Sequence, residues 1–141
     1  MIIRIATPAD AGDLARMNAA FNGVSDSAAQ IAARLVAYAD IETAILAELD
    51  GQVGGFACVR IVPCVLYAEP YADLTELYVE PEFRRRGVGR ALIAYAEQLA
   101  HVRGANDLLI MTGVDNAAAQ ALYRVAGYDT YAVALNRKVS E

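Results

Sequence analysis

A run of arginines and glycines between two apolar segments is the part of the sequence whose residue types most directly indicate chemistry. Glycines allow backbone N–H groups to face an anion, a helix N-terminus carries partial positive charge, and arginine side chains add fixed cations. The pattern therefore predicts a turn that binds a phosphate group. Its residues are Arg84, Arg85, Arg86, Gly87, Val88, Gly89 and Arg90.

This turn does not match the two best-known phosphate-binding loops. It is not a Walker A loop, because no Gly-Lys-Ser/Thr follows it, and it lacks the third glycine of a dinucleotide-binding fingerprint. Taken alone, the same residues would also suit a solvated helix start with a cationic face. Its meaning therefore depends on the rest of the chain.

The overall charge limits the classes of partner. Twelve Lys and Arg against 17 Asp and Glu give a net charge of −5, which is the wrong balance for binding a nucleic-acid backbone. Four of those 12 cations lie in the arginine-glycine turn. We therefore expect an acidic protein with one basic patch and no nucleic-acid partner.

Length and composition predict one folded domain over residues 1–141. The chain has 141 residues and is 57% hydrophobic, enough apolar surface for a core without metal or disulfide staples. It has no apolar stretch long enough for a transmembrane span and no signal-peptide pattern. We expect a cytoplasmic protein that does not bind membranes.

The cysteines and the histidine provide little chemistry. Cys58 and Cys64 form no Cys-x-x-Cys motif, and the one histidine, His101, is distant in sequence. We expect reduced thiols, no metal site and no cysteine nucleophile.

Local patterns predict ten elements. Thr7-Pro8 and Ser27-x-x-Gln30 are helix-start signals, Asp50-Gly51 suits a type I′ hairpin turn, and Gly54-Gly55 indicates a bulge or a close backbone approach. Strands are predicted over residues 1–6, 43–49, 52–62, 74–79, 107–112 and 128–135, and helices over about 8–20, 28–38, 88–103 and 117–126.

The order of these elements predicts an α/β fold. It reads strand, two helices, three antiparallel strands, helix, strand, helix, strand, which suits one mixed sheet with helices on its faces. Ligands tend to enter such sheets where the topology switches, beside the carboxyl end of a strand and the start of a helix. The arginine-glycine turn has that position.

Several short motifs follow one another along the chain. They are Leu77-x-Val79-x-Pro81, then Arg84-x-x-Gly87-x-Gly89, then Asn116, and then Leu122-Tyr123-x-x-x-Gly127-Tyr128. In these motifs and their order the chain resembles the Gcn5-related N-acetyltransferase (GNAT) family, and the resemblance covers the order of elements from Ile2 to Leu135. It implies a V-shaped gap between the fourth and fifth strands, filled by acetyl-CoA.

The resemblance also implies roles for individual residues. Backbone groups from Arg85 to Arg90 would hold the pyrophosphate, and the backbone of Leu77 and Val79 would pair with the pantetheine arm. Asn116 would contact the same arm. The hydroxyl of Tyr123 would meet the thioester sulfur as general acid.

The chemistry of the transfer requires a base. A primary amine with a pKa near 10 must lose a proton before it attacks a thioester. Glu76 is the candidate base, because strand alternation turns it to the face opposite Leu77 and Val79; a water path is the alternative. The backbone N–H of Val79 is a candidate for stabilising the developing oxyanion, worth about 3 kcal/mol in comparable sites.

The acceptor is less clearly indicated. The family resemblance implies that the two N-terminal helices and the loop before the CoA-binding strand select it, here through segments 21–26 and 63–73. Aromatic and acidic side chains in these segments would suit a cationic amine. They are Phe21, Tyr67, Glu69, Tyr71 and Asp73.

The expected reaction is direct transfer to the acceptor in a ternary complex. A small-molecule amine is favoured over a protein N-terminus or a lysine. Three alternatives stay open: transfer of a longer acyl group, a silent CoA-binding domain, and an interaction module. A homodimer formed through the last strand is also predicted.

Overall fold

The computed structural model describes residues 1–140, which form two compact units, residues 1–110 and 111–140. The first unit contains a five-stranded sheet of order β1-β2-β3-β4-β5. The first four strands pair antiparallel and β5 runs parallel to β4, so the predicted mixed α/β sheet is confirmed. The strands are β1 (Ile2–Ile5), β2 (Glu42–Leu49), β3 (Gln52–Val62), β4 (Tyr71–Val79) and β5 (Leu109–Ile110).

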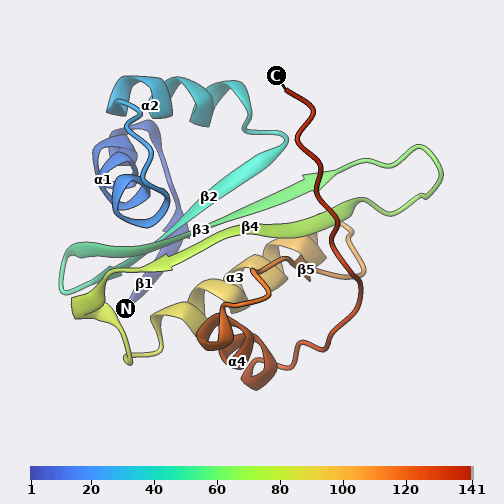
Figure 1. Cartoon of the computed structure of the whole chain (residues 1–141). Helices are drawn as coiled ribbons and strands as arrows, with labels where there is room; N and C mark the ends of the chain where they lie inside the picture. Colours follow the sequence, from blue (N-terminus) through green and yellow to red (C-terminus); the bar gives the residue numbers. More distant parts are fainter. Residues whose placement is uncertain (141) are drawn as a thin grey trace. The chain divides into compact units, whose positions relative to one another are not determined.

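Helices cover both faces of this sheet. The α1 helix (Ala11–Asn22) and the α2 helix (Ala28–Ala37) lie on one face, and the α3 helix (Val88–Val102) lies on the other (Figure 1). The predicted capping box starts α2: Gln30 N donates to Ser27 Oγ at 3.1 Å, and Ser27 N donates to the Gln30 side chain at 2.8 Å. The signal at Pro8 instead opens a short 3₁₀ turn, η1 (Pro8–Asp10), which leads into α1.

The two glycine patterns in the β2–β3 hairpin behave as predicted. Asp50 and Gly51 have φ values of 53° and 77°, and positive φ at both central residues is the signature of a type I′ turn. The register then shifts between Ala47 and Glu48, so that Gly54 has no partner on β2. Gly54 is therefore the extra residue of a bulge.

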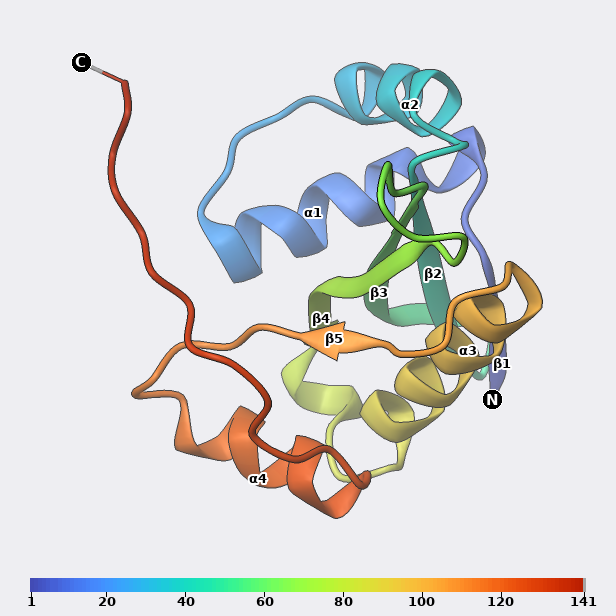
Figure 2. The ribbon, with the colours of Figure 1, turned by 90° about the vertical axis from the view of Figure 1, so that its right-hand side faces the viewer.

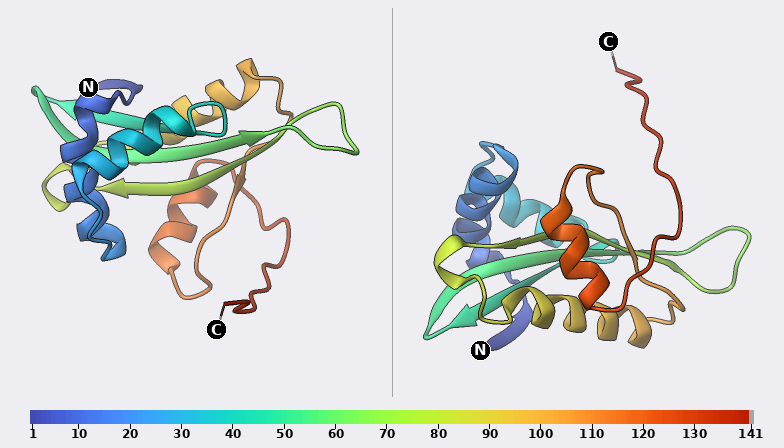
Figure 3. Two further views of the ribbon diagram at one scale, coloured as in Figure 1. Left: turned by 90° about the horizontal axis from the view of Figure 1, so that it is seen from above. Right: turned by 60° about the horizontal axis from the view of Figure 1, so that its bottom comes forward.

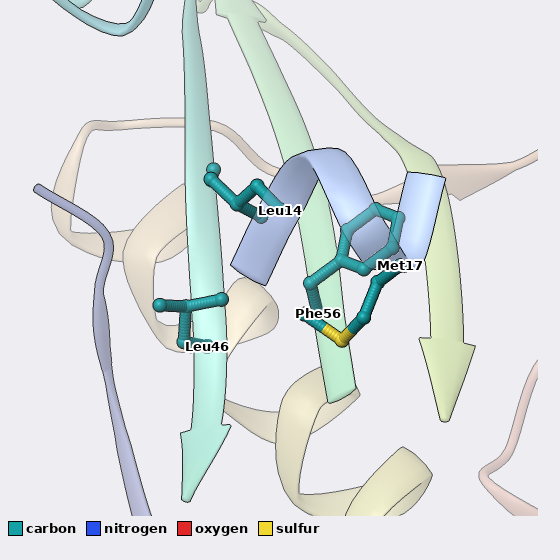
Figure 4. Close-up of a cluster of buried hydrophobic side chains, with 5 residues drawn as sticks. Leu14, Met17, Leu46 and Phe56 are labelled. Carbon is teal, nitrogen blue, oxygen red and sulfur yellow. The ribbon is translucent and has the colours of Figure 1, made fainter. Parts of the chain in front are cut away.

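One part of the core lies between α1 and the sheet. Met17 from α1 and Leu46 from β2 are completely buried and pack with Leu14 and Phe56 (Figure 4). Ile31 and Leu35 of α2 pack at the margin of this cluster and stay partly exposed. Consequently α2 borders the core without sealing it.

A second bulge interrupts β4. Cys58 pairs with Glu76 and Val59 pairs with Leu74, so Thr75 is the extra residue. On the other side of β4, β5 pairs only with Asp73 and Leu74 (Figure 2). The β5 strand is shorter than the predicted 107–112 because its partner bends at the bulge and the ladder ends there.

The long loop between β3 and β4, residues 63–70, projects beyond the end of the sheet (Figure 3). It carries three consecutive apolar residues, Val65, Leu66 and Tyr67, which are largely exposed. The β4 strand begins at Tyr71, three residues before the predicted start, because residues 71–73 already pair with β3.

The second unit contains α4 (Ala117–Val125), with residues 111–116 before it and residues 126–140 after it. Asn116 caps the helix by accepting from Ala119 N at 3.1 Å, and Gly127 follows its end with φ 98°; both agree with the sequence prediction. No helix within residues 1–140 is both long and apolar enough to cross a membrane.

The predicted last strand over 128–135 is wrong. Residues 128–140 have no regular secondary structure. Alternate apolar side chains, Tyr131, Val133 and Leu135, are more than 80% exposed. A strand needs a hydrogen-bonding partner, and no strand described in the structure pairs with this segment.

Candidate functional site

The arginine-glycine turn is attached to the sheet through one aromatic ring. A 3₁₀ turn, η2 (Pro81–Phe83), follows β4, and Glu80 N donates to Gly54 O at 2.8 Å. The buried Phe83 ring lies on Gly54, where an added Cβ would be 2.4 Å from two ring atoms. Only glycine at position 54 allows this contact, which holds the residues just before Arg84 against β3.

The backbone of the turn suits an anion. Arg85 and Gly87 have left-handed φ values of 62° and 79°, and Gly87 is the N-cap of α3. The first helical bond runs from Ala91 N to Gly87 O. By helix geometry the N–H groups of Val88, Gly89 and Arg90 then lack an intrahelical acceptor. Because the Val88 side chain is buried, it contributes only its backbone N–H.

The four arginines are not equivalent. Arg84 Nε donates to Val79 O at 2.9 Å, and its guanidinium lies 6.0 Å from the Tyr78 ring centroid. Arg86 lies 3.6 Å from an Asp50 carboxylate oxygen and 5.9 Å from the Phe83 ring centroid. Arg85 and Arg90 extend into solvent. Two arginines therefore brace the turn, and two leave their charge available for a ligand.

The strand that leads into the turn has an open edge. Leu77 and Val79 pair with Ala57 and Gly55 on the β3 side. On the other side, no strand of the described chain pairs with β4 beyond Leu74. An extended ligand arm could pair there, as proposed from the sequence for Leu77 and Val79.

Glu76 lies on the predicted face of β4. Its register partner is Cys58, on the face covered by α1 and α2, whereas Leu77 pairs with Ala57 on the opposite face. Glu76 Oε2 accepts from Asn22 Nδ2 at 3.3 Å. No cation within residues 1–140 forms an ion pair with it. A carboxylate held only by an amide can still receive a proton or a cation.

A pocket of about 250 Å³ opens beside Glu76. It lies over the sheet face covered by α1 and α2, and most of its wall is apolar. Glu42 is a second carboxylate in this wall; it lies one residue before the predicted start of its strand, which is why the sequence analysis missed it. The lining residues are Leu14, Asn18, Ile31, Arg34, Leu35, Tyr38, Glu42, Ala44, Phe56, Cys58 and Glu76.

The Cys58 thiol lies in the wall of this pocket between acidic neighbours. Burial, followed by the charges of Glu42 and Glu76, raises the pKa of the thiol far above its usual value. The thiol therefore stays protonated at neutral pH. A protonated thiol is a poor nucleophile.

The side chains expected from the sequence to bind an acceptor do not line this pocket. Tyr67 is 72% exposed on the projecting loop, and neither it nor Glu69 lines the pocket. Phe21 belongs to α1, where its ring centroid lies 5.1 Å from that of Tyr78. Asp73 has one buried oxygen without a hydrogen bond among the described residues, and burial raises the pKa of its carboxyl. The pocket is built by helices and strands instead.

Two of the predicted residues belong to the second unit. Asn116 uses its side-chain oxygen to cap α4, which leaves its amide N–H groups for other partners. The half-buried Tyr123 ring meets Tyr128 edge-on, with centroids 6.4 Å apart. Burial raises the pKa of Tyr123 above its usual value, so the phenol is protonated at neutral pH.

Comparison with known proteins agrees with this architecture. Residues 17–128 match the model of the acetyltransferase (GNAT) family. An aminoglycoside N(6')-acetyltransferase type 1 of Stenotrophomonas maltophilia is 29% identical over 130 residues, which span 90% of this chain and 85% of that protein.

Solved structures share the fold. A putative acetyltransferase from Agrobacterium tumefaciens superposes with a TM-score of 0.87 at 22% identity, covering 98% of this chain and 99% of that one. AAC(6')-Iy, in complex with the bisubstrate analogue CoA-S-monomethyl-acetylneamine, superposes with a TM-score of 0.84 at 24% identity, covering 99% and 98%.

The chain belongs to the GNAT acetyltransferase family. It is an N-acetyltransferase, and its family uses acetyl-CoA as the acetyl donor.

Proposed function

We propose that the protein transfers an acetyl group from acetyl-CoA directly to a primary amine of a small molecule. One observation carries this proposal: Glu76, which forms no ion pair within residues 1–140, faces a pocket from the same strand whose open edge leads into the arginine-glycine turn. Donor and acceptor would then approach the same strand, from its edge and from its face.

The chain offers acetyl-CoA two kinds of backbone contact. The first-turn N–H groups of α3, with Arg85 and Arg90, would hold the pyrophosphate. The open edge of β4 at Leu77 and Val79 would pair with the pantetheine arm, and Asn116 would donate to the same arm. When bound, acetyl-CoA supplies the thioester carbonyl that the amine attacks.

Glu76 would accept the proton of the attacking amine. An ammonium with a pKa near 10 is almost wholly protonated at neutral pH, so deprotonation must accompany attack. A carboxylate paired only with the Asn22 amide can accept that proton directly or through a water. The Val79 N–H would stabilise the negative charge that develops on the thioester oxygen.

The state of Cys58 supports direct transfer. This thiol shares the pocket with Glu76, so it is the one cysteine placed to take part in a two-step transfer. Its raised pKa keeps it protonated, which disfavours an acetyl-cysteine route.

Tyr123 would return a proton to the departing thiolate. An acid in this role must be protonated at the working pH, and the raised pKa of Tyr123 meets that condition.

The name of the first relative supports a small-molecule acceptor, since that protein acetylates aminoglycosides. The homodimer remains a prediction from sequence, and residues 128–135 now contribute exposed apolar side chains rather than a strand edge.

The donor site is tested by thermal shift with acetyl-CoA, CoA and NAD. A ligand that binds only the native state, at 100 times its Kd, adds about 2.7 kcal/mol of stability, so acetyl-CoA and CoA are expected to raise the Tm and NAD is not. Arg84→Ala and Gly89→Glu should weaken the shift. Arg103→Ala, at the far end of α3, changes the net charge as Arg84→Ala does and should leave it intact. Equal shifts in all variants would refute the donor site.

The catalytic roles are tested by CoA release with a saturating amine. Glu76→Gln should lower kcat at neutral pH, and the deficit should shrink as pH rises toward the pKa of the amine. Tyr123→Phe should lower kcat with little change in acetyl-CoA affinity. Tyr131→Phe, on an exposed ring, should change neither kcat nor the affinity. Unchanged kcat across pH would remove Glu76 or Tyr123 from its role.

A further inference from the structure

The pocket beside Glu76 has two chemically different parts. Glu42 and Glu76 provide one part. Glu76 is the β4 register partner of Cys58, and Glu42 stands two residues before the β2 partner of Cys58, so both carboxylates lie beside Cys58 in the pocket wall. The other part is apolar and comes from Leu14, Ile31, Leu35 and Phe56. A ligand that fills the pocket must therefore be charged at one end and apolar along its body.

The carboxylate end favours a single cation. Glu42 accepts a hydrogen bond from the Thr75 hydroxyl, and its second oxygen lies 3.8 Å from Arg60. Glu76 accepts only from the Asn22 amide. Arg34, the cation in the pocket wall, is already paired with Asp26. Of these two carboxylates, Glu76 is therefore the one that forms no ion pair with a described residue.

The apolar part favours a ligand with one cationic group over a polycation. Burying an ammonium against hydrocarbon without a partner is very costly, and the pocket wall offers no further carboxylate beyond Glu42 and Glu76. Its volume of about 250 Å³ is also below the range of about 300–1,000 Å³ that holds drug-sized ligands. An aminoglycoside, with several ammonium groups on linked sugar rings, matches neither property.

We infer that the acceptor is a small monoamine whose single ammonium binds at Glu76 and Glu42 and whose alkyl or aryl body fills the pocket between Leu35 and Phe56. This inference rests on the proposed function and specifies its substrate class. It makes Leu35 and Glu42 determinants of specificity, and it separates this chain from relatives named for aminoglycosides.

The test compares kcat/KM for three amines: 2-phenylethylamine, ethanolamine and the aminoglycoside sisomicin. Removing apolar contacts of even one methylene typically costs 10-fold or more in kcat/KM, so 2-phenylethylamine is expected to exceed ethanolamine and sisomicin by at least about 10-fold. An equal or higher value for sisomicin would overturn the inference and leave the proposed function standing. No CoA release with any amine, by protein that binds acetyl-CoA, would overturn the proposed function itself.

Two matched pairs of variants locate the effect. Leu35→Gln should lower the ratio of kcat/KM for 2-phenylethylamine to that for ethanolamine about 10-fold, whereas Val36→Gln, on the exposed side of α2, should not. Glu42→Gln should lower kcat/KM for all monoamines, whereas Glu69→Gln on the projecting loop should not. The ratio within one variant is independent of how much protein is folded. An unchanged ratio in Leu35→Gln would refute the assignment of the pocket.

Discussion

Gly54→Ala is expected to disturb both stability and donor binding through one contact. The new Cβ would lie 2.4 Å from the Phe83 ring, while non-bonded carbons prefer about 3.5–4.0 Å, so the ring must move by roughly 1 Å. Phe83 is buried, and overpacking of this kind costs about 1–3 kcal/mol. At this chain length the Tm should fall by roughly 3–10 °C.

The same displacement should reach the ligand site, because Phe83 immediately precedes the arginine-glycine turn. A shift of about 1 Å in a binding group is enough to weaken positioning substantially, and we expect the Kd for acetyl-CoA to rise about 10-fold. Thermal unfolding and titration with acetyl-CoA measure the two effects.

Gly12→Ala is the matched control. Position 12 is the second residue of α1 and has no atom within 4 Å of an added Cβ, so this change should stabilise the protein by about 0.4–1 kcal/mol by restricting the unfolded chain. In a Phe83→Ala background the cost of Gly54→Ala should largely disappear. If Gly54→Ala leaves both the Tm and the Kd unchanged, the contact between Phe83 and Gly54 does not hold the turn.

Two further predictions concern side chains of the first unit. Cys58→Ala should retain at least about half of kcat, because a protonated thiol takes no part in direct transfer. If the variant instead loses most of its kcat and also loses a burst of acetylated enzyme seen in the parent, the transfer proceeds in two steps. Asp10 hydrogen-bonds Arg4 at 2.8 Å, which lowers its pKa from 3.8 to about 2. Ionised Asp10 therefore stabilises the folded protein at pH values above its unfolded-state pKa, and this stabilisation is lost as the pH falls through about 2. Asp10→Asn should destabilise the protein at pH 7 and much less at pH 2. An equal deficit at both pH values in chemical denaturation would contradict this ion pair.

Local signals predicted the turns and helix starts well. The Ser27 capping box, the Asp50-Gly51 turn and the Gly54 bulge each depend on a few neighbouring residues. A short stretch of sequence therefore contains all the information needed to predict each of them. The face of Glu76 also followed from alternation, because no bulge intervenes between Glu76 and Val79.

Features that depend on distant pairing were not predictable. The β5 strand is short because its neighbour bends at Thr75. Residues 128–135 alternate like a strand, but no strand of the described chain forms a ladder with them. The pocket wall from Leu35 to Phe56 combines a helix with a strand more than 20 positions away. Periodicity identifies the apolar face of each element, but it does not show where two such faces leave a pocket between them.

The extra residue Thr75 limits how far the sheet extends. Deleting it would leave Glu76 opposite Cys58 and would give β3 and β4 an uninterrupted ladder. Straightening β4 would change the edge at Leu77 and Val79, and the shortened chain should bind acetyl-CoA less well. One extra residue in β4 thus leaves a stretch of strand edge without a strand partner in the described chain, where a ligand can form backbone hydrogen bonds.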